Sequence, residues 1–511
     1  MEVEYGIQPA DLPMDGGDLG VQNEGGGDIG AQNGGGGGGG LGVPNENVGG
    51  AIQNQARVRH VCCMGAGHAG VLSMAVMADY HPEIIFRIVD TNPDLIQRWQ
   101  GGGGGVSPFY EPGLEELLQI VRGRNLFFSQ NMDEAIQQAN LIFIAVDVPK
   151  KAKGIGAGSY FDLTDWENAV RRIKAVCPEP KVIVEKSTVP IDISNTIANI
   201  LGQNQFGVQF LILSNPDFFS QGTAIQDLRE PTRVVIGRKH GQGNVTVLQE
   251  LYSRWVPQDR FIIVDDYKSI ELGKIANNAF LAMKLMFMNM MSSFCDRLGA
   301  DVDDVKRIAA RDSRISENYL NPCVGFGGPG LIKDVCFMKY ILNYYNYTEE
   351  AKFFGNIIKL NTKRKERFIA EMLNRMIALK KKRIAVLGFS YKKNTDDIRD
   401  SAAIDICRFL LYKEDSEIRI YDPKVPRDKI LSCFRRGAKV SAHATPNAAW
   451  NNADAVCFLV DWDQFHTIQF QQMYQEMSKP AFFFDGCNCG FNYNQIRYLG
   501  FDLYVAGRPS I

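Results

Sequence analysis

The sequence predicts an α/β protein with two parallel-sheet domains joined by a long central helix. Two observations carry this prediction. Short apolar runs rich in β-branched residues alternate with helical patterns in two separate blocks, which is typical of parallel sheets covered on both faces. Between the blocks, residues 266–300 form one unbroken helical pattern that contains no proline and has Gly299 near its end.

Four segments follow from this pattern in chain order. Residues 1–57 are rich in glycine and poor in apolar side chains, so we expect a disordered tail. Residues 58–265 hold the first alternating block, residues 266–380 the central helices, and residues 381–511 the second alternating block. The apolar stretch "FLAMKLMFMNMM" in the long helix predicts association between chains. The alternative is a core helix buried within one chain.

Glycines in the first block predict a dinucleotide site. A strand ends in "MGAGHAG", which places Gly65, Gly67 and Gly70 at the start of a helix, and Asp90 ends the next strand. In such Rossmann-like folds the glycines allow a tight turn and a close approach of the pyrophosphate to the helix N-terminus. Asp90 would accept hydrogen bonds from the ribose hydroxyls and repel a 2′-phosphate, which favours NAD over NADP. The alternative is a glycine turn in an α/β protein of another kind.

Composition argues against several other classes of protein. The net charge of −2 gives no basic surface for nucleic acid. The longest apolar stretch contains Lys284 and is too short to span a bilayer. The 11 cysteines show no metal-ligand spacing, so we expect reduced thiols and no metal site. The N-terminal residues lack the pattern of a signal or transit peptide, which predicts a cytosolic protein.

Longer motifs identify a family. From about Val58 to about Ala506 the chain resembles the UDP-glucose 6-dehydrogenases of eukaryotes, with a plant-like character. The motifs that carry the resemblance are "FYEPGLEELL", "VEKSTVP", "SNPDFFSQGTAI", "ELGKIANNAFLA", "SRISENYLNPCVGFGG" and "LGFSYKKNTDDIRD". The resemblance implies two Rossmann-like domains joined by a dimer-forming helix, with NAD as cofactor. The reaction it implies converts UDP-glucose, two NAD and water into UDP-glucuronate and two NADH.

The resemblance also implies roles for individual residues. The expected catalytic residues are Asp217, Lys274, Asn278 and Asp334, with Gly330 at the position of the nucleophile. The expected cofactor-binding residues are Gly65, Ala66, Gly67, His68, Ala69, Gly70, Asp90, Val146, Asp147, Val148, Pro149, Lys150, Ser187, Thr188, Gly330, Lys333 and Arg399. The expected substrate-binding residues are Asp217, Phe218, Gln221, Lys274, Asn278, Leu281, Arg314, Phe326, Gly327, Tyr391, Lys392 and Cys487. The residues alone agree in part, because Lys274 and Asn278 are four apart and share a helix face.

The sequence departs from the family pattern at this site. Oxidation of an aldehyde to an acid needs a group that first adds to the aldehyde carbon, and the family uses a cysteine thiolate that forms a thioester. Gly330 stands at that position. Asp217 and Gln221 replace two glutamates of the family pattern, Cys487 replaces an arginine, and "DVPK", residues 147–150, replaces a neutral turn.

Two functions of different classes therefore stay open. One is an NAD-dependent UDP-glucose 6-dehydrogenase whose turnover is impaired by the loss of the thiol. The other is a non-catalytic protein that binds NAD or UDP-sugar and joins active relatives in hetero-oligomers. Production of NADH from UDP-glucose by the purified protein, expected to be a homo-oligomer in the first case, would discriminate between them.

Overall fold

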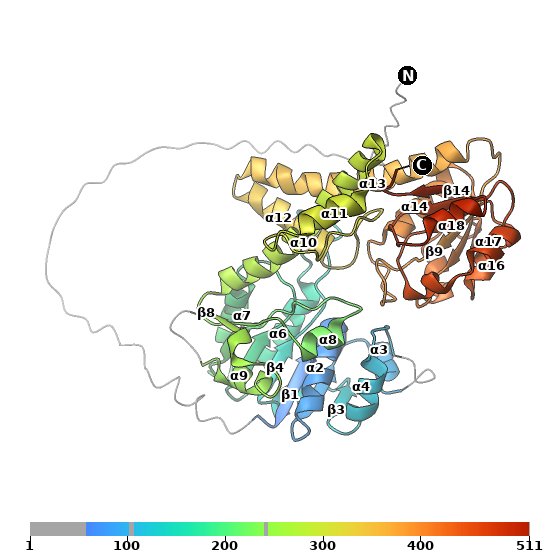
Figure 1. Cartoon of the computed structure of the whole chain (residues 1–511). Helices are drawn as coiled ribbons and strands as arrows, with labels where there is room; N and C mark the ends of the chain where they lie inside the picture. The colour runs from blue at the N-terminus through green and yellow to red at the C-terminus, as the bar shows by residue number, and fades with distance from the viewer. Residues whose placement is uncertain (1–57, 102–106, 240–243, 510–511) are drawn as a thin grey trace, which may run out of the picture. The chain divides into compact units, whose positions relative to one another are not determined.

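The computed structural model describes residues 58–101, 107–239 and 244–509, and its elements are labelled in Figure 1. The predicted tail, residues 1–57, lies outside the described residues. The two parallel-sheet domains and the long helix that the sequence predicts are present. Among the described helices, none combines the length and the apolar character that a membrane span requires.

The first sheet has eight strands in the order β3-β2-β1-β4-β5-β6-β7-β8. The first six have the strand order of a doubly wound dinucleotide-binding fold, with the switch point between β1 and β4. These six run parallel, whereas β7 pairs with β6 in the antiparallel sense through Ser214 and Gly237. The strands are β1 His60–Met64, β2 Ile85–Val89, β3 Leu126–Ser129, β4 Leu141–Ile144, β5 Val182–Glu185, β6 Leu211–Ser214, β7 Val234–Gly237 and β8 Phe261–Val264.

Helices cover both faces of this sheet, because the central strands are apolar on both sides. Strands β1, β4 and β5 are buried over most or all of their lengths, and their side chains divide between two separate apolar clusters. The covering elements are α2 His68–Tyr80, α3 Pro93–Trp99, α4 Leu114–Val121, α5 Met132–Gln138, α6 Thr164–Val176, α7 Ile193–Gly202, α8 Ala224–Arg229, α9 Thr246–Tyr252 and the short 3₁₀ turn η1 Gln258–Arg260.

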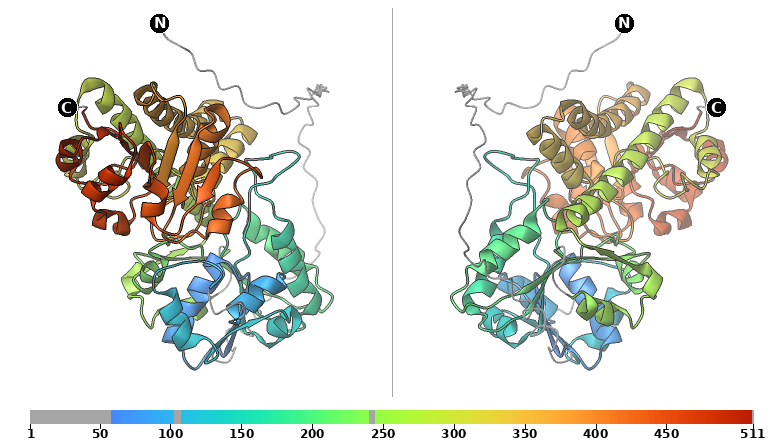
Figure 2. Two further views of the ribbon diagram at one scale, coloured as in Figure 1. Left: turned by 90° about the vertical axis from the view of Figure 1, so that its right-hand side faces the viewer. Right: turned by 90° about the vertical axis from the view of Figure 1, so that its left-hand side faces the viewer.

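The long helix α10, Tyr267–Leu298, begins and ends at local signals in the sequence. The Asp266 side chain accepts hydrogen bonds from the backbone N–H groups of Lys268 and Ser269, and Gly299 ends the helix with a φ of 71°. Figure 2 shows α10 as the long yellow-green helix. Helices α12 and α13 pack on it and on each other. The remaining central helices are α11 Val302–Ala310, α12 Leu331–Tyr344 and α13 Thr348–Arg375.

The second sheet has six parallel strands in the order β11-β10-β9-β12-β13-β14. This is again the doubly wound order, and two apolar clusters lie on its two faces. Its strands are β9 Arg383–Leu387, β10 Glu417–Tyr421, β11 Val440–Ala442, β12 Ala455–Phe458, β13 Phe482–Asp485 and β14 Asp502–Val505. Its helices are α14 Ala402–Lys413, α15 Arg427–Leu431, α16 Pro446–Trp450, η2 Asp463–Thr467, α17 Phe470–Glu476 and α18 Tyr493–Tyr498.

Candidate active site

The glycine turn between β1 and α2 has the geometry that a dinucleotide requires. Gly65 has a φ of +110°, and a Cβ atom there would lie 2.4 Å from the carbonyl oxygen of Ala145. A Cβ on Gly70 would lie 2.2 Å from the Gly65 oxygen, whereas a Cβ on Gly67 would meet no atom within 4 Å. The turn is therefore tight on its inner side and open at Gly67, where a pyrophosphate can approach the backbone. These residues fit NAD.

Asp90 follows the end of β2 beside this turn. One carboxylate oxygen accepts the backbone N–H of Ala66 at 2.8 Å, and the other accepts the N–H of Asn92 at 2.9 Å. Each oxygen keeps a further lone pair, so the carboxylate can also accept hydrogen bonds from ribose hydroxyls. Ala69, another expected cofactor-binding residue, packs against the apolar cluster under α2.

His68 is the first residue of α2 and stacks on Phe109 with a centroid distance of 3.7 Å. Burial lowers the pKa of His68 to about 4, although the charge of Asp397 acts in the opposite direction. The imidazole is therefore neutral near pH 7. It therefore adds no positive charge to the glycine turn. The attraction for phosphate must come from the N-terminus of α2 and from Arg399.

A second cluster joins α10 to the start of α12. Asn278 donates its amide to a carboxylate oxygen of Asp334 at 2.6 Å. The other Asp334 oxygen is buried and has no hydrogen-bond partner among the described residues. A Cβ on Gly330, which immediately precedes α12, would lie 3.4 Å from the Asn278 amide nitrogen. Lys274, one turn earlier on α10, donates to the backbone carbonyl of Asp217. The predicted catalytic residues thus lie in two linked pairs, and Asn278 is the one that lies beside Gly330.

Burial shifts the proton affinities of this cluster. It lowers the pKa of the Lys274 ammonium group, against the attraction of Asp334 and Asp217. It raises the pKa of the Asp334 carboxyl group, against the charges of Lys333 and Lys274. The two shifts bring the proton affinities of the amine and the carboxyl group closer together, which suits acid–base chemistry.

Lys186 is a site residue that the sequence analysis missed. Its ammonium group is buried at the end of β5 and lies 2.6 Å from a carboxylate oxygen of Asp217. Burial raises the pKa of Asp217, and Lys186 counteracts that shift. The signal in the sequence is a lysine that directly follows the apolar strand "VIVE". The residues after it, Ser187 and Thr188, line a cavity of about 10 Å³ together with Lys274, room for roughly one water molecule.

Further predicted substrate residues follow β9 or lie on the loop before α12. Lys392 donates to the Ser220 hydroxyl at 2.8 Å, and burial lowers its pKa. The Tyr391 ring packs so closely on this loop that a Cβ on Gly328 would lie 2.6 Å from it. At Gly327 a Cβ would lie 2.2 Å from the carbonyl oxygen of Asp400. This loop therefore admits only glycine at its closest approaches. The neighbouring Phe326 is buried in an apolar cluster with α10.

Contacts at this site join the first sheet domain to the second sheet domain and to the central helices. The Gln221 amide donates to Asp397 at 3.2 Å, and the guanidinium of Arg399 bonds to both oxygens of that same carboxylate. Lys333 reaches from α12 to the carbonyl of Val148, which lies in the turn after β4, at 2.8 Å. The expected cofactor residues Val146, Asp147, Pro149 and Lys150 occupy that same turn.

Other expected substrate residues are placed differently. The Arg314 side chain is 88% exposed and pairs with Asp312. The Cys487 thiol donates to the carbonyl of Leu459 at 2.9 Å, within the second sheet domain. Leu281 lies on α10, one turn beyond Asn278, and is partly buried. The Phe218 ring lies 4.9 Å from the Lys274 ammonium nitrogen, beside the catalytic cluster.

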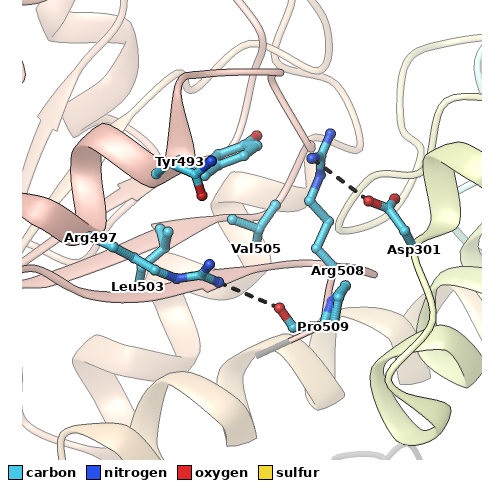
Figure 3. A pocket seen from close by; sticks show the side chains of 8 residues that line it. Asp301, Tyr493, Arg497, Leu503, Val505, Arg508 and Pro509 are labelled. Carbon is cyan, nitrogen blue, oxygen red and sulfur yellow. Dashed lines mark hydrogen bonds and ion pairs between the residues drawn. The ribbon is translucent and has the colours of Figure 1, made fainter. Parts of the chain in front are cut away.

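A pocket of about 100 Å³ lies elsewhere, at the last strand of the second sheet (Figure 3). The Arg508 guanidinium stacks over Tyr493 at 4.8 Å and is tied to Asp303 and Asn488. None of the predicted site residues lines it. Its lining residues are Asp301, Tyr493, Asn494, Arg497, Leu503, Val505, Arg508 and Pro509.

Comparison with known proteins gives three matches to one family. Residues 59–256 match the NAD-binding domain of the UDP-glucose/GDP-mannose dehydrogenase family, residues 268–363 its central domain, and residues 385–491 its UDP-binding domain.

Individual relatives extend this comparison over most of the chain. UDP-glucose 6-dehydrogenase 4 of Oryza sativa subsp. japonica is 40% identical over 471 residues, which are 88% of this chain and 97% of the relative. UDP-glucose 6-dehydrogenase 4 of Arabidopsis thaliana is 39% identical over the same shares. A solved UDP-glucose dehydrogenase from Pyrobaculum islandicum is 25% identical, with a TM-score of 0.75 and coverage of 92% of this chain and 100% of that one.

Proposed function

The chain belongs to the UDP-glucose/GDP-mannose dehydrogenase family, and on that premise we propose that it oxidises UDP-glucose at C6 to UDP-glucuronate with two NAD. The observation that carries this proposal is the pairing of Asn278 with Asp334 beside Gly330, one helix turn from Lys274, which bonds to Asp217. NAD, held by the glycine turn, Asp90 and Arg399, supplies the hydride acceptor when it is bound.

The first oxidation needs a base for the C6 hydroxyl proton. The Asp334 oxygen without a hydrogen-bond partner among the described residues is the acceptor we assign to it. Asn278 holds the other oxygen of that carboxylate and so fixes its direction. Lys274 stabilises negative charge on the oxygen that loses the proton, because its ammonium group is largely removed from water. Lys392 and Tyr391 hold the nucleotide end of the substrate.

At position 330 there is no thiol to begin the second oxidation. In the described part of the chain Gly330 presents only backbone towards Asn278. Water must then add to the aldehyde carbon, and Lys274 and Asp334 transfer the protons that this addition moves. We therefore expect the aldehyde-to-acid step to limit the rate.

A second candidate is a non-catalytic subunit that binds NAD or UDP-sugar. The observation in its favour is the combination of Gly330 with Gln221 and Cys487, whose side chains are engaged with Asp397 and the Leu459 carbonyl. Association in homo-oligomers or with active relatives, and a cytosolic location, belong to both candidates. Phe280, Phe287 and Phe294 support association, because they are about half exposed and recur every seven residues along α10.

The deciding experiment uses the full-length protein with UDP-glucose and NAD. Isothermal titration first measures binding of each ligand, and NADH absorbance with chromatography of the UDP-sugars then measures turnover. The proposal predicts NADH and UDP-glucuronate in a ratio of two to one once the reaction is complete. Binding of both ligands without any NADH would favour the non-catalytic subunit.

A further inference from the structure

Two ion pairs connect the turn after β4 with the segment before α14. Asp147 lies 3.4 Å from Arg399, and Lys150 lies 3.3 Å from Asp400, each measured between nitrogen and carboxylate oxygen. The turn belongs to the first sheet domain and the segment to the second. Each pair therefore joins the two domains across about 250 residues of sequence.

These ion pairs lie beside the glycine turn. The backbone that begins the β4 turn packs so tightly against Gly65 that a Cβ on this glycine would contact Ala145. His68, the first residue of α2, lies within electrostatic range of Asp147 and Arg399. In doubly wound folds the phosphates of a dinucleotide bind at this helix N-terminus. Both charges of the first ion pair are thus close to the region where the phosphates bind.

Asp397 fixes the Arg399 side chain and leaves one of its nitrogens for another partner. Nε and Nη2 donate to the buried Asp397 carboxylate, at 2.9 and 2.6 Å from one of its oxygens. Nη1 is the nitrogen that reaches Asp147. The Asp147 side chain is 71% exposed, so it can turn into water at little cost. Arg399 is therefore held in place by Asp397, whereas another anion can take the place of Asp147 at Nη1.

We propose that Asp147 competes with the pyrophosphate of the dinucleotide for Arg399 and thereby lowers the affinity for NAD. The inference rests on the NAD site of the proposed function and adds a residue that opposes binding at it. A pyrophosphate carries two negative charges and forms stronger hydrogen bonds with a guanidinium than an exposed carboxylate does. The phosphate therefore displaces Asp147 from Nη1, while the Lys150–Asp400 pair can persist beside it.

The test is the dissociation constant of NAD for the full-length protein, measured by isothermal titration without UDP-glucose. Asp147→Asn removes the competing charge and should tighten NAD binding roughly 2- to 5-fold. Asp147→Glu keeps the charge and should bind NAD within about twofold of the parent. Asp259→Asn removes one negative charge from an exposed site in η1 and should change nothing.

A second background separates competition for Arg399 from general repulsion between Asp147 and phosphate. In Arg399→Met protein, adding Asp147→Asn should improve NAD binding by less than about twofold. An equal gain in both backgrounds would overturn the proposed competition, and so would unchanged or weaker binding by Asp147→Asn alone. If NAD binds neither the parent nor the variant, the proposed NAD site fails as well, which separates that outcome from failure of the Asp147 inference alone.

Discussion

Replacing Gly330 by cysteine should accelerate the oxidation of the aldehyde without altering the fold. Gly330 has φ −98° and ψ −60°, a conformation open to any residue, and its Cβ would lie 3.4 Å from the Asn278 amide nitrogen, an ordinary contact. A residue that caps less well than glycine at this helix N-terminus costs about 0.5–1 kcal/mol. This loss is small beside the roughly 5–15 kcal/mol by which folded proteins are typically stable.

The new thiol would lie where a thiolate is favoured. The N-terminus of α12 stabilises negative charge, and Lys274 lies one turn along α10 from Asn278. A free thiol with a pKa of about 8.5 is roughly 10% ionised at pH 7.5, and lowering that pKa by one unit raises the fraction to about 50%. Together with covalent attack on the aldehyde, this should increase the rate of UDP-glucuronate formation at least about tenfold.

The assay is chromatographic analysis of UDP-sugars after incubation with UDP-glucose and NAD, with the aldehyde trapped by hydroxylamine in a parallel sample. Trapped aldehyde should form at a rate within about twofold of the parent, because the first oxidation does not use sulfur. Gly330→Ser is the matched control, since it adds a side chain of similar shape without a thiol. The reasoning fails if the serine variant gains as much as the cysteine variant, or if the parent already matches the latter.

Three further predictions concern the choice of cofactor, the exposed phenylalanines of α10 and the dependence of stability on pH. Asp90→Ala should weaken NAD more than NADP in titrations, and equal affinities of the parent for both cofactors would contradict the assignment. Phe287→Glu should reduce association in sedimentation experiments at micromolar concentration, whereas Glu at the exposed Ile377 should not. Because the pKa of His68 is about 4 in the folded protein and 6.5 as its ordinary value, the unfolded chain takes up the proton first. The contribution of His68 to the free energy of unfolding should therefore fall by about 2–3 kcal/mol between pH 7 and pH 4.5. Urea titrations at the two pH values should show that the His68→Gln variant loses less free energy of unfolding on acidification than the parent does. Equal losses in the two proteins would rule out His68 as the cause.

The elements with local signals were predictable from the sequence. The helical pattern over residues 266–300 matches α10, Tyr267–Leu298, because the Asp266 cap and the left-handed Gly299 act on their immediate neighbours. The glycine turn was predictable for the same reason, since its constraints lie within one strand–turn–helix unit. The grouping of Lys274 with Asn278 followed from helix spacing alone.

Contacts between distant segments were not predictable in this way. Lys186 follows β5 and Asp217 follows β6, so their pairing depends on these two strands ending side by side at one edge of the sheet. The sequence indicates only a lysine after an apolar strand. The pairing of Asp147 with Arg399 depends on how the two sheet domains pack together. The antiparallel pairing of β7 with β6 likewise has no local signal, because both strands are short buried apolar runs.

Gln221 shows why the departures from the family pattern need separate interpretations. Its amide donates to Asp397 and its carbonyl oxygen accepts from the Thr395 hydroxyl. A carboxylate at this position would face the Asp397 carboxylate, and the repulsion between them would raise the pKa of at least one of the two. Burial acts to raise the pKa of Asp397, yet the hydrogen bonds and charge of Arg399 hold it below its ordinary value. The amide thus places no second negative charge beside Asp397, and the Asp397–Arg399 pair stays intact. Glutamine at position 221 therefore fits its described neighbours, whereas glycine at position 330 lacks a chemical group that no described neighbour replaces.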